Sequence, residues 1–381
     1  MAISSAATIR KHFGKLRDPR MRRRRRHHLL NIVTMAICAV VADCDTWQDI
    51  GIFVQKRQDW FKRFLSLPEG VPSHDTFERV FSRLDPAAFG ACFQSWVEAV
   101  SELVGLPHIA IDGKTLRRSF NRAAGLGPLH TVCAWAVKQH LTLAQVAVDG
   151  KSNEITAIPR LLELLDVHGA LVTIDAMGCQ KEIAAKIVGG GGDYLLTVKD
   201  NQPNLLEDIR TTVEQALDGT IPAEQVDHYA TQECGHGRDE ERSYTVIHNV
   251  EGIRERQSWS KLTAVGICYS ERTVNGKSSS EARFFIGSRR MNAKHYGDAL
   301  RSHWGIENSL HWKLDITFDE DSSRVQNRNA AENFAWLRRM AVSLLKRNPT
   351  KLSTRSKRKA AAWDPDFLEE IVAAGPKLGK G

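Results

Sequence analysis

Three acidic residues far apart in the chain stand at positions from which carboxylates can bind divalent cations. Asp112 follows the apolar residues 109–111 and Asp175 follows the apolar residues 170–174, so both are expected at the ends of β-strands. Glu307 lies in a helical stretch. Oxygen ligands of this kind suit Mg²⁺ or Mn²⁺, which keep coordination positions for water and phosphate. If the two strands are neighbours, their carboxylates could share an ion, and two ions about 4 Å apart could activate one oxygen and stabilise another.

Each of these acids also has an ordinary structural interpretation. An aspartate after a strand commonly closes a turn, and Glu307 fits an exposed helical surface. Four acids downstream are alternatives for the third carboxylate, and we interpret them as cap or surface residues: Asp315, Asp319, Glu320 and Asp321.

The helix around Glu307 offers a second kind of metal site. His303, Glu307 and His311 are spaced four residues apart, so they share one helical face and could bind zinc or iron. Because the sequence lacks the H-E-x-x-H arrangement that would make this site specific, the carboxylate site stays the preferred interpretation.

The elements that must position these acids change in character along the chain. Residues 1–100 are predicted to be helical, because apolar residues recur there at helical spacing. Strands are then predicted at 108–112, 131–137, 141–148, 170–174 and 194–198, and helices at 153–165, 181–188 and 204–217. The strands at 131–137 and 141–148 should pair antiparallel, and Pro159 should kink its helix or delay its start. This order, which RNase-H-like folds share, predicts an α/β fold with a mixed sheet flanked by helices.

The rest of the chain divides into a strand-rich insertion, a helical segment and a basic tail. Strands are predicted between 221 and 290, and helices from 293 to 346. Beyond Pro349 the tail is rich in lysine and arginine and is expected to be mobile. The predicted domains are therefore 1–100, 101–220, 221–290, 291–348 and 349–381, with the catalytic core in the second and the fourth.

Composition narrows the class of partner and the compartment. The 381 residues carry 53 lysines and arginines against 45 acids, a formal net charge of +8, which favours a polyanionic partner. Seven scattered cysteines without a C-x-x-C pair indicate a reducing compartment, such as the cytoplasm. The apolar run 29–42 behind the basic cluster 22–26 is too short to span a bilayer, so we predict a buried helix rather than a signal peptide or membrane anchor.

Four stretches of the chain resemble DDE transposases of the ISAs-one type, a group that includes the bacterial H-repeat-associated proteins. They are GVPSHDTFERVF from Gly70, IAIDGKTLRRS from Ile109, TIDAMGCQK from Thr173 with GDYLLTVKDNQ from Gly192, and HWGIENSLHWKLD from His303 with FDED from Phe318. These stretches are long and specific, and they reach over nearly the whole chain.

The resemblance implies an RNase-H-like catalytic core with a strand-rich insert before the last carboxylate. It implies Asp112, Asp175 and Glu307 as the catalytic and metal-binding residues, with two Mg²⁺ ions for which Mn²⁺ can substitute. The implied reaction is metal-dependent hydrolysis and strand transfer of DNA phosphodiester bonds at the ends of an insertion sequence. The implied partners are double-stranded DNA with terminal inverted repeats, which the N-terminal helical domain would bind, and target DNA, with at least a homodimer on DNA.

One pattern of the wider relatives is missing. In those relatives a tyrosine is followed after two residues by an arginine, and after three more residues by the glutamate. A lysine comes after six further residues. Leu300, His303 and Leu314 occupy the tyrosine, arginine and lysine positions here, with Arg301 and Lys313 close by. The phosphate-binding roles of that pattern, and a hairpin intermediate, are therefore not carried over.

Cationic and aromatic residues near the three acids are candidate DNA contacts. Lys114, Arg117 and Arg118 follow Asp112 and could hold backbone phosphates, although a solvated basic loop explains them equally well. The other candidates are Lys199, His303, Trp304 and Lys313.

Some of these positions fit other interpretations too. Trp304 could stack on an unpaired base or belong to the core. The arginines at 22–26 favour phosphate contact. A basic helix end could bind DNA or face water, and it comprises Arg338, Arg339, Lys346 and Arg347.

Two rival functions stay open at the level of sequence. The chain could be a catalytically silent or domesticated DNA-binding relative, or a metal-dependent nuclease that cleaves without joining. A Mg²⁺ assay on labelled element ends separates them, because the first would bind without cleaving and the second would cleave without strand transfer.

Overall fold

A computed structural model describes residues 9–101, 107–120, 125, 127–148, 154–235 and 237–373 of the chain. The chain forms two compact units. Unit 1 contains Met1–Gly105, Gly113–Asn153 and Glu307–Gly381, and unit 2 contains Leu106–Asp112 and Glu154–Ile306. The chain therefore passes between the units within strand β1 (His108–Leu116) and directly after helix α10 (Ala293–Ile306).

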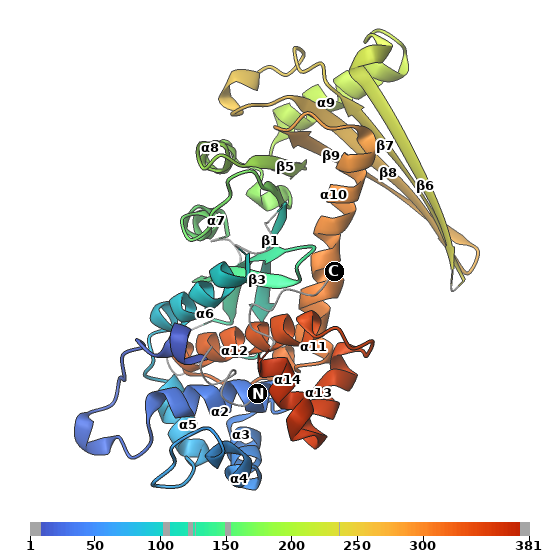
Figure 1. The fold of residues 1–381 in the computed structure, drawn as a ribbon. Coiled ribbons are helices and arrows are strands. Elements are labelled where there is room, and N and C mark those ends of the chain that lie inside the picture. Colours follow the sequence, from blue (N-terminus) through green and yellow to red (C-terminus); the bar gives the residue numbers. More distant parts are fainter. Residues whose placement is uncertain are drawn as a thin grey trace. The chain divides into compact units, whose positions relative to one another are not determined.

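The described strands form one mixed sheet in the order β3-β2-β1-β4-β5-β9-β8-β7-β6 (Figure 1). β1 pairs in parallel with β4, and β4 pairs in parallel with β5, whereas β2 and β3 are antiparallel, as predicted. The expected α/β fold, with a mixed sheet flanked by helices, is confirmed. The strands after β1 are β2 (Leu129–Ala136), β3 (Leu141–Val148), β4 (Leu171–Ile174), β5 (Asp193–Val198), β6 (Val226–Gly235), β7 (Arg238–Ile247), β8 (Ala264–Val274) and β9 (Lys277–Gly287).

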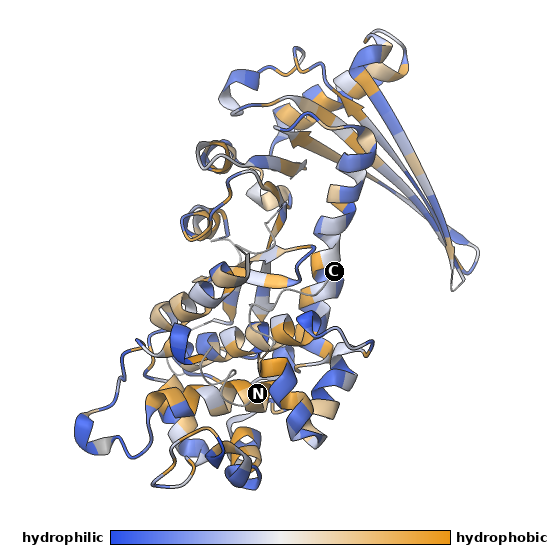
Figure 2. Ribbon diagram, viewed as in Figure 1, coloured by the Kyte–Doolittle hydropathy of each residue, from blue (hydrophilic) through white to orange (hydrophobic). Residues whose placement is uncertain are grey.

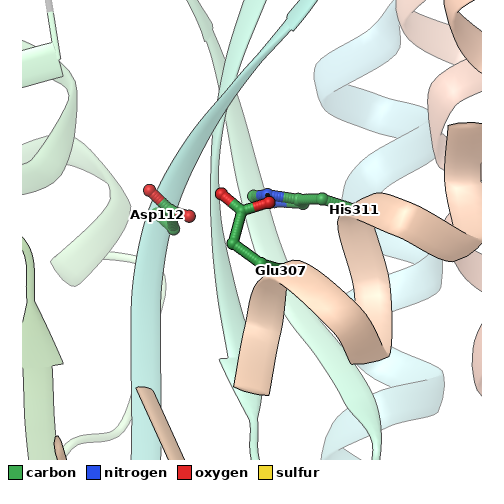
Figure 3. A group of neighbouring side chains, drawn as sticks. All are labelled: Asp112, Glu307 and His311. Atoms are coloured by element: carbon green, nitrogen blue, oxygen red, sulfur yellow. Dashed lines mark ion pairs between the residues drawn. The ribbon is translucent and has the colours of Figure 1, made fainter. Parts of the chain in front are cut away.

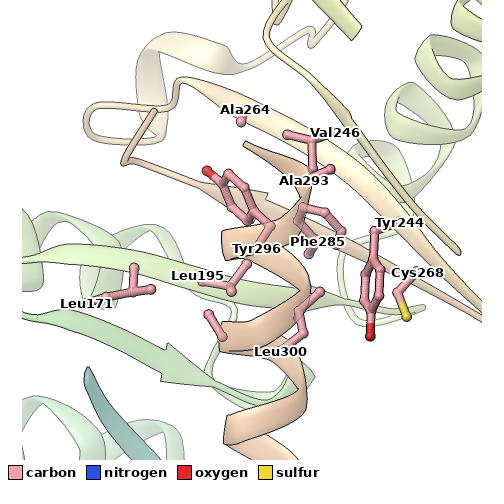
Figure 4. Packing of buried hydrophobic residues seen from close by; sticks show 11 residues of the cluster. Leu171, Leu195, Tyr244, Val246, Ala264, Cys268, Phe285, Ala293, Tyr296 and Leu300 are labelled. Atoms are coloured by element: carbon pink, nitrogen blue, oxygen red, sulfur yellow. The ribbon is translucent and has the colours of Figure 1, made fainter. Parts of the chain in front are cut away.

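The core of unit 2 lies between its strands and helix α10. β4 and β5 are buried along their whole length, which is typical of parallel strands covered on both faces. Leu171 of β4 and Leu195 of β5 share one buried cluster with Tyr296 and Leu300 of α10, and Phe285 of β9 also belongs to it (Figure 4). The other helices of this unit are α7 (Glu154–Leu162), α8 (Lys181–Gly189) and α9 (Pro203–Leu217).

The predicted insertion is rich in strands, as expected, and it extends the sheet. β9 pairs antiparallel with β5, so that Leu195 lies opposite Gly287 and Val198 opposite Phe284. β8, β7 and β6 then add to the edge in turn. The distal ends of these long strands are exposed and hydrophilic (Figure 2).

The described helices of unit 1 surround two mostly buried helices, α2 (Leu29–Val41) and α12 (Arg328–Arg347). α2 is the buried helix expected from the apolar run, and its hydrophobic colouring is plain in Figure 2. Trp47 packs on the ring of Phe81 and meets Phe334 of α12 edge-on, which ties three helices together. The other helices here are α3 (Trp47–Lys56), α4 (Gln58–Lys62), α5 (His74–Phe81), α6 (Pro86–Ser101), α11 (Trp312–Ile316), α13 (Thr354–Trp363) and α14 (Pro365–Ala373). Among the described residues, no helix is both long and apolar enough to cross a membrane.

The expectation of a mobile basic tail was wrong for the described residues up to 373. They form α13 and α14, and two of the tail's cations are buried. Lys357 donates hydrogen bonds to the carbonyl oxygens of Leu345 (3.0 Å) and Asn348 (2.6 Å). Arg358 pairs with Asp45 at 2.9 Å. The cations are structural because they satisfy buried acceptors, which charge counting along the sequence does not detect. Residues 374–381 lie outside the described part.

Two element boundaries also differ from the expectation. β1 continues through Asp112 to Leu116 instead of entering a turn at the aspartate. Pro159 lies inside α7, which begins at Glu154, and residue 153 of the predicted helix is outside the described residues.

Candidate active site

The two candidate aspartates of unit 2 stand level with each other on neighbouring parallel strands. In the parallel pairing of β1 with β4, Ile111 lies opposite Ile174. Asp112 is the residue after Ile111, and Asp175 is the residue after Ile174. Neighbouring strands are about 4.8 Å apart, and residues in register point to the same face of a sheet. Asp112 is half-buried and Asp175 is exposed. Each aspartate therefore comes directly after one of the two paired residues, and neither is fully buried.

Asp175 also organises the turn that follows it. Its carboxylate accepts a hydrogen bond from the backbone N–H of Met177 at 3.2 Å, at the start of the short 3-10 helix Ala176–Gly178. A second lone pair and the other oxygen remain available to a cation, since a carboxylate has about four acceptor positions. The turn function and a metal function are therefore compatible.

A buried polar network fastens helix α10 to the strands that carry these aspartates. The Thr173 hydroxyl lies 3.0 Å from Nδ1 of His303 on α10 and 2.9 Å from Nε2 of His108 on β1. All three side chains are buried. Thr173 lies in β4 two residues before Asp175, which directly follows the strand. The network of His108, Thr173 and His303 therefore lies next to the end of β4 that precedes Asp175.

The direction of α10 follows from its successive contacts. Leu300 belongs to the cluster that contains Leu171, and His303 contacts Thr173, further along β4. Two strand residues advance about 6.6 Å and one helical turn about 5.4 Å, so helix and strand advance together. α10 therefore runs along β4 toward the end where Asp175 stands. Glu307 directly follows α10, one turn after His303 and on the same helical face.

Glu307 begins a π-helical turn, Glu307–His311. Such turns are rare and frequent at functional sites. Within unit 1, Nδ1 of His311 lies 3.5 Å from a carboxylate oxygen of Glu307, and its Nε2 lies 3.9 Å from the Cys133 sulfur. Glu307 is 66% exposed and His311 is buried, so a fixed imidazole supports an accessible carboxylate.

Figure 3 draws three candidate metal-binding side chains: Asp112 from β1 in unit 2, and Glu307 and His311 from the π-helical turn of unit 1. The two carboxylates suit Mg²⁺ or Mn²⁺, and the imidazole is a donor that transition metals accept. The zinc or iron alternative named His303 in place of Asp112. In the structure the Nδ1 atom of His303 lies 3.0 Å from the buried hydroxyl of Thr173, within unit 2.

Lys114 and two of the downstream acids form an ion network in unit 1. The Lys114 ammonium is 8% exposed and lies 2.5 Å from Asp315 and 3.5 Å from Asp321. Arg117 is exposed and contacts Asp321 at 3.3 Å. Burial raises the pKa of Asp315, and the charge of Lys114 opposes that shift. The acids neutralise a buried cation here.

Glu320 is not a surface or cap acid, so that interpretation was wrong. Its side chain is fully buried and its carboxylate lies 3.1 Å from the guanidinium of Arg339, which also donates to the Thr131 hydroxyl at 3.1 Å. Burial alone would raise the pKa of Glu320, but the charges of Arg339 and Arg338 outweigh it and hold the pKa below its ordinary value. Arg338 and Arg339 are buried too, so neither alternative for that helix end, DNA or water, describes them.

The remaining candidate DNA contacts lie in varied surroundings and stay predictions. Arg118 and Lys199 are exposed. Trp304 is partly buried, with the Arg283 guanidinium 3.9 Å from its ring centre. The Lys313 ammonium lies 4.4 Å from the ring of Trp312.

Three residues of the site were not among the predicted catalytic residues: His108, Thr173 and His311. A signal for Thr173 was present, since it shares the strand face of Asp175 two residues away. His311 was noticed only as part of the rival site. His108 gave no signal, because its role depends on the pairing of β1 with β4.

Comparison with known proteins is consistent with this geometry. Residues 104–344 match the model of the family described as "Transposase DDE domain", and residues 10–97 match the one described as "DDE_Tnp_1-associated". "Putative transposase YncI" of Escherichia coli O157:H7 is 39% identical over 95% of this chain and 93% of its own length. "H repeat-associated putative transposase YhhI" of Escherichia coli K12 is 35% identical over 96% of this chain and 97% of its own length.

Among solved structures, a piggyBac transposase synaptic complex with hairpin DNA aligns with a TM-score of 0.41 at 12% identity, over 99% of this chain and 80% of that one, a likeness too weak to support a conclusion. The sequence relatives are much nearer, and they cover almost the whole chain. Since the DDE-domain match also spans more than half of its residues, the protein belongs to the DDE transposase family.

Proposed function

We propose that this protein is an active DDE transposase that hydrolyses DNA phosphodiester bonds at the ends of an insertion sequence and joins the freed ends to target DNA. Asp112, Asp175 and Glu307 are the proposed catalytic and metal-binding residues. The observation that supports the proposal most is the parallel pairing of β1 with β4, because Asp112 and Asp175 each come directly after the paired residues Ile111 and Ile174. Paired carboxylates in this relation are suited to bridging divalent cations.

The chain's own residues contribute positioning and charge. Two Mg²⁺ ions, or Mn²⁺ in their place, would supply Lewis-acid polarisation of the attacked phosphate and of the attacking oxygen. Asp112 and Asp175 would hold them from a rigid sheet, and Glu307 from the end of α10. The His311 imidazole, 3.5 Å from the Glu307 carboxylate, would help to orient it. Neither hydrolysis nor joining needs a covalent bond to the protein, so catalysis rests on orientation and electrostatic stabilisation.

The proposed partners are double-stranded DNA with terminal inverted repeats and a target DNA. Bringing two element ends together requires at least two copies of the chain on DNA. The compartment that fits such a substrate is the bacterial cytoplasm, at the nucleoid.

The experiment is cleavage and strand transfer of labelled element ends by purified protein in Mg²⁺, repeated with Asp175→Asn. The variant should bind the DNA with nearly unchanged affinity and lose cleavage, because it removes a ligand oxygen and not a phosphate contact. Asp298→Asn is the matched control: Asp298 is exposed on α10 and pairs only with Lys294 in the described structure, and such a pair contributes at most about 0.5 kcal/mol.

Equal cleavage by Asp175→Asn and the unchanged protein would remove Asp175 from the site. Binding without cleavage by the unchanged protein would favour a DNA-binding relative without catalysis. Cleavage without joined products would favour a nuclease.

A further inference from the structure

A basic groove lies in the helical domain that precedes the catalytic core. Its volume is about 690 Å³, and two segments line it: the loop that leads into α2, and α5 with the turns at its two ends. Five of its eleven lining residues are arginines, and Glu69 is the only acid among them. The DDE-domain match begins at residue 104, so this groove lies outside it.

The loop wall of the groove is braced from within. Arg20 is largely buried and donates to both carboxylate oxygens of Asp18, at 3.0 and 2.8 Å, and to the carbonyl of His27 at 2.6 Å. Arg25 donates to the carbonyl oxygens of Arg20 (2.9 Å) and Asp18 (3.1 Å). These two arginines hold the loop in one shape, so Arg23 and Arg26, which point their charge to solvent, stand on a fixed backbone.

The helical wall presents Arg79 and Arg83, both exposed. Arg79 donates to the carbonyl of Asp75 at 3.1 Å, which holds its stem along the helix. Among the described residues, no carboxylate forms an ion pair with Arg23, Arg26, Arg79 or Arg83. Four such charges around one hollow repel each other, and an anionic ligand would relieve that repulsion.

The lining excludes other classes of ligand. Small-molecule pockets are mostly apolar, whereas only Val71 and Val80 are apolar here. Single-stranded nucleic acid is usually held by stacking on aromatic rings, and the lining contains no Phe, Tyr or Trp. Burial together with the charges of Arg20 and Arg26 lowers the pKa of His27, which is consistent with a positive field inside the groove.

The charge of the whole chain is concentrated in the same part. Residues 1–100 contain sixteen lysines and arginines against ten acids, so they carry six of the eight net positive charges. The rest of the chain, almost three times as long, is nearly neutral. A polyanion would therefore be drawn to this domain first.

We infer that this groove binds the sugar–phosphate backbone of duplex DNA, with Arg23, Arg26, Arg79 and Arg83 as the phosphate contacts. The inference rests on the proposed function, for which it gives the first domain a defined DNA-binding surface. Guanidinium groups suit phosphate because their planar fork makes paired hydrogen bonds. Contacts of this kind set the position of the protein on DNA and do not read its sequence.

The test is binding of a fluorescent 30-base-pair duplex by the full chain, followed by anisotropy in EDTA from 50 to 200 mM salt. Arg23→Gln with Arg26→Gln, and separately Arg79→Gln with Arg83→Gln, should each reduce the slope of log affinity against log salt by about two, since each phosphate contact contributes about 0.9. Affinity at 0.1 M salt should fall on the order of 10- to 100-fold. The matched control is Arg355→Gln with Lys359→Gln, which removes two exposed charges from α13 and should leave the slope nearly unchanged.

Three results would overturn the inference: unchanged slopes in both groove variants, an equal loss in the α13 control, or a loss on single-stranded 30-mer as large as on duplex. Glu69→Gln guards against misfolded variants, because its expected effect is a gain in affinity that misfolding cannot produce. It removes the single acid of the groove lining and should tighten duplex binding several-fold. Unaltered binding by this variant would count against the groove. EDTA prevents cleavage, so failure here leaves the Asp175→Asn test of catalysis intact.

Discussion

Two sets of acids in this chain lie in different surroundings. Asp112, within β1, is half-buried, and Asp175 and Glu307 are exposed. Asp315 and Glu320, by contrast, lie against the buried cations Lys114 and Arg339. The two sets contain the same residue types. Whether an acid is available to bind a cation or stabilises the fold therefore depends on the residue it contacts in the folded chain.

The energetics of the two sets differ for the same reason. A buried ion pair is expensive to desolvate, and removing one member leaves an unpaired charge in the interior. An exposed carboxylate at a strand end contributes little to stability, but it is available to a cation. The first set should therefore affect chemistry without affecting folding, and the second should do the reverse.

The largest effect is expected for Asp112→Asn. Loss of one stabilising donor in an enzyme site costs roughly 10² to 10³ in rate, and a shared metal ligand should cost at least about 10³. Cleavage of labelled element ends would be followed alongside thermal unfolding, which should be unchanged. A variant that unfolds earlier by many degrees would place Asp112 with the structural acids.

Glu320→Gln should show the opposite behaviour. It leaves the fully buried Arg339 without its counter-charge, and breaking such a pair costs about 3–5 kcal/mol of unfolding free energy. The measurement is urea unfolding followed by fluorescence. Asp298→Asn, an exposed pair on α10, should change stability by under about 0.5 kcal/mol. Similar urea midpoints for the two variants would end the distinction between the two sets.

Thr173→Val sharpens the comparison, because it removes a buried contact that acts through geometry. The hydroxyl joins His108 and His303, so its loss should loosen α10 and lower kcat about 10- to 100-fold, as is typical of groups that orient ligands. KM for the DNA should hardly change, and Thr173→Ser should restore the rate. A parallel loss in both variants would argue against this positioning role.

The smallest effect is a change in the acid sensitivity of folding. The pKa of Glu320 is lowered in the folded state, so its contribution is present above the unfolded pKa of about 4.3 and is lost as pH falls through the lower folded value. The unchanged protein should lose stability below about pH 4.5 more steeply than Glu320→Gln. Urea midpoints measured from pH 6 to pH 3.5 would show this, and parallel curves would contradict it.

Much of the fold followed from local pattern. The apolar run 29–42 became the buried helix α2, and the strand pair β2–β3 lies where alternation indicated. The positions of Asp112 and Asp175 directly after the paired residues of β1 and β4 could also be predicted, because each aspartate comes directly after a short apolar run. Local periodicity determines these features, and they need no knowledge of distant contacts.

The expectations that failed concern charged residues that are buried in the fold, such as Glu320 and Arg358. The ion pair of Lys114 with Asp315, which lies 201 residues away, likewise gave no signal in the sequence. Arg358 belonged to a supposedly mobile tail and is fully buried against Asp45, 313 residues away. No sequence pattern encodes such separations.

By itself, then, the sequence determined the order of strands and helices, the family and the positions of three carboxylates, since these depend on neighbours along the chain. Only the tertiary structure decided which charges are buried, how Thr173 joins His108 to His303, and how arginines from two segments surround one groove. The physical reason is that the free energy of a charge depends on its solvent and its partners, and both are set by segments that meet only when the chain has folded.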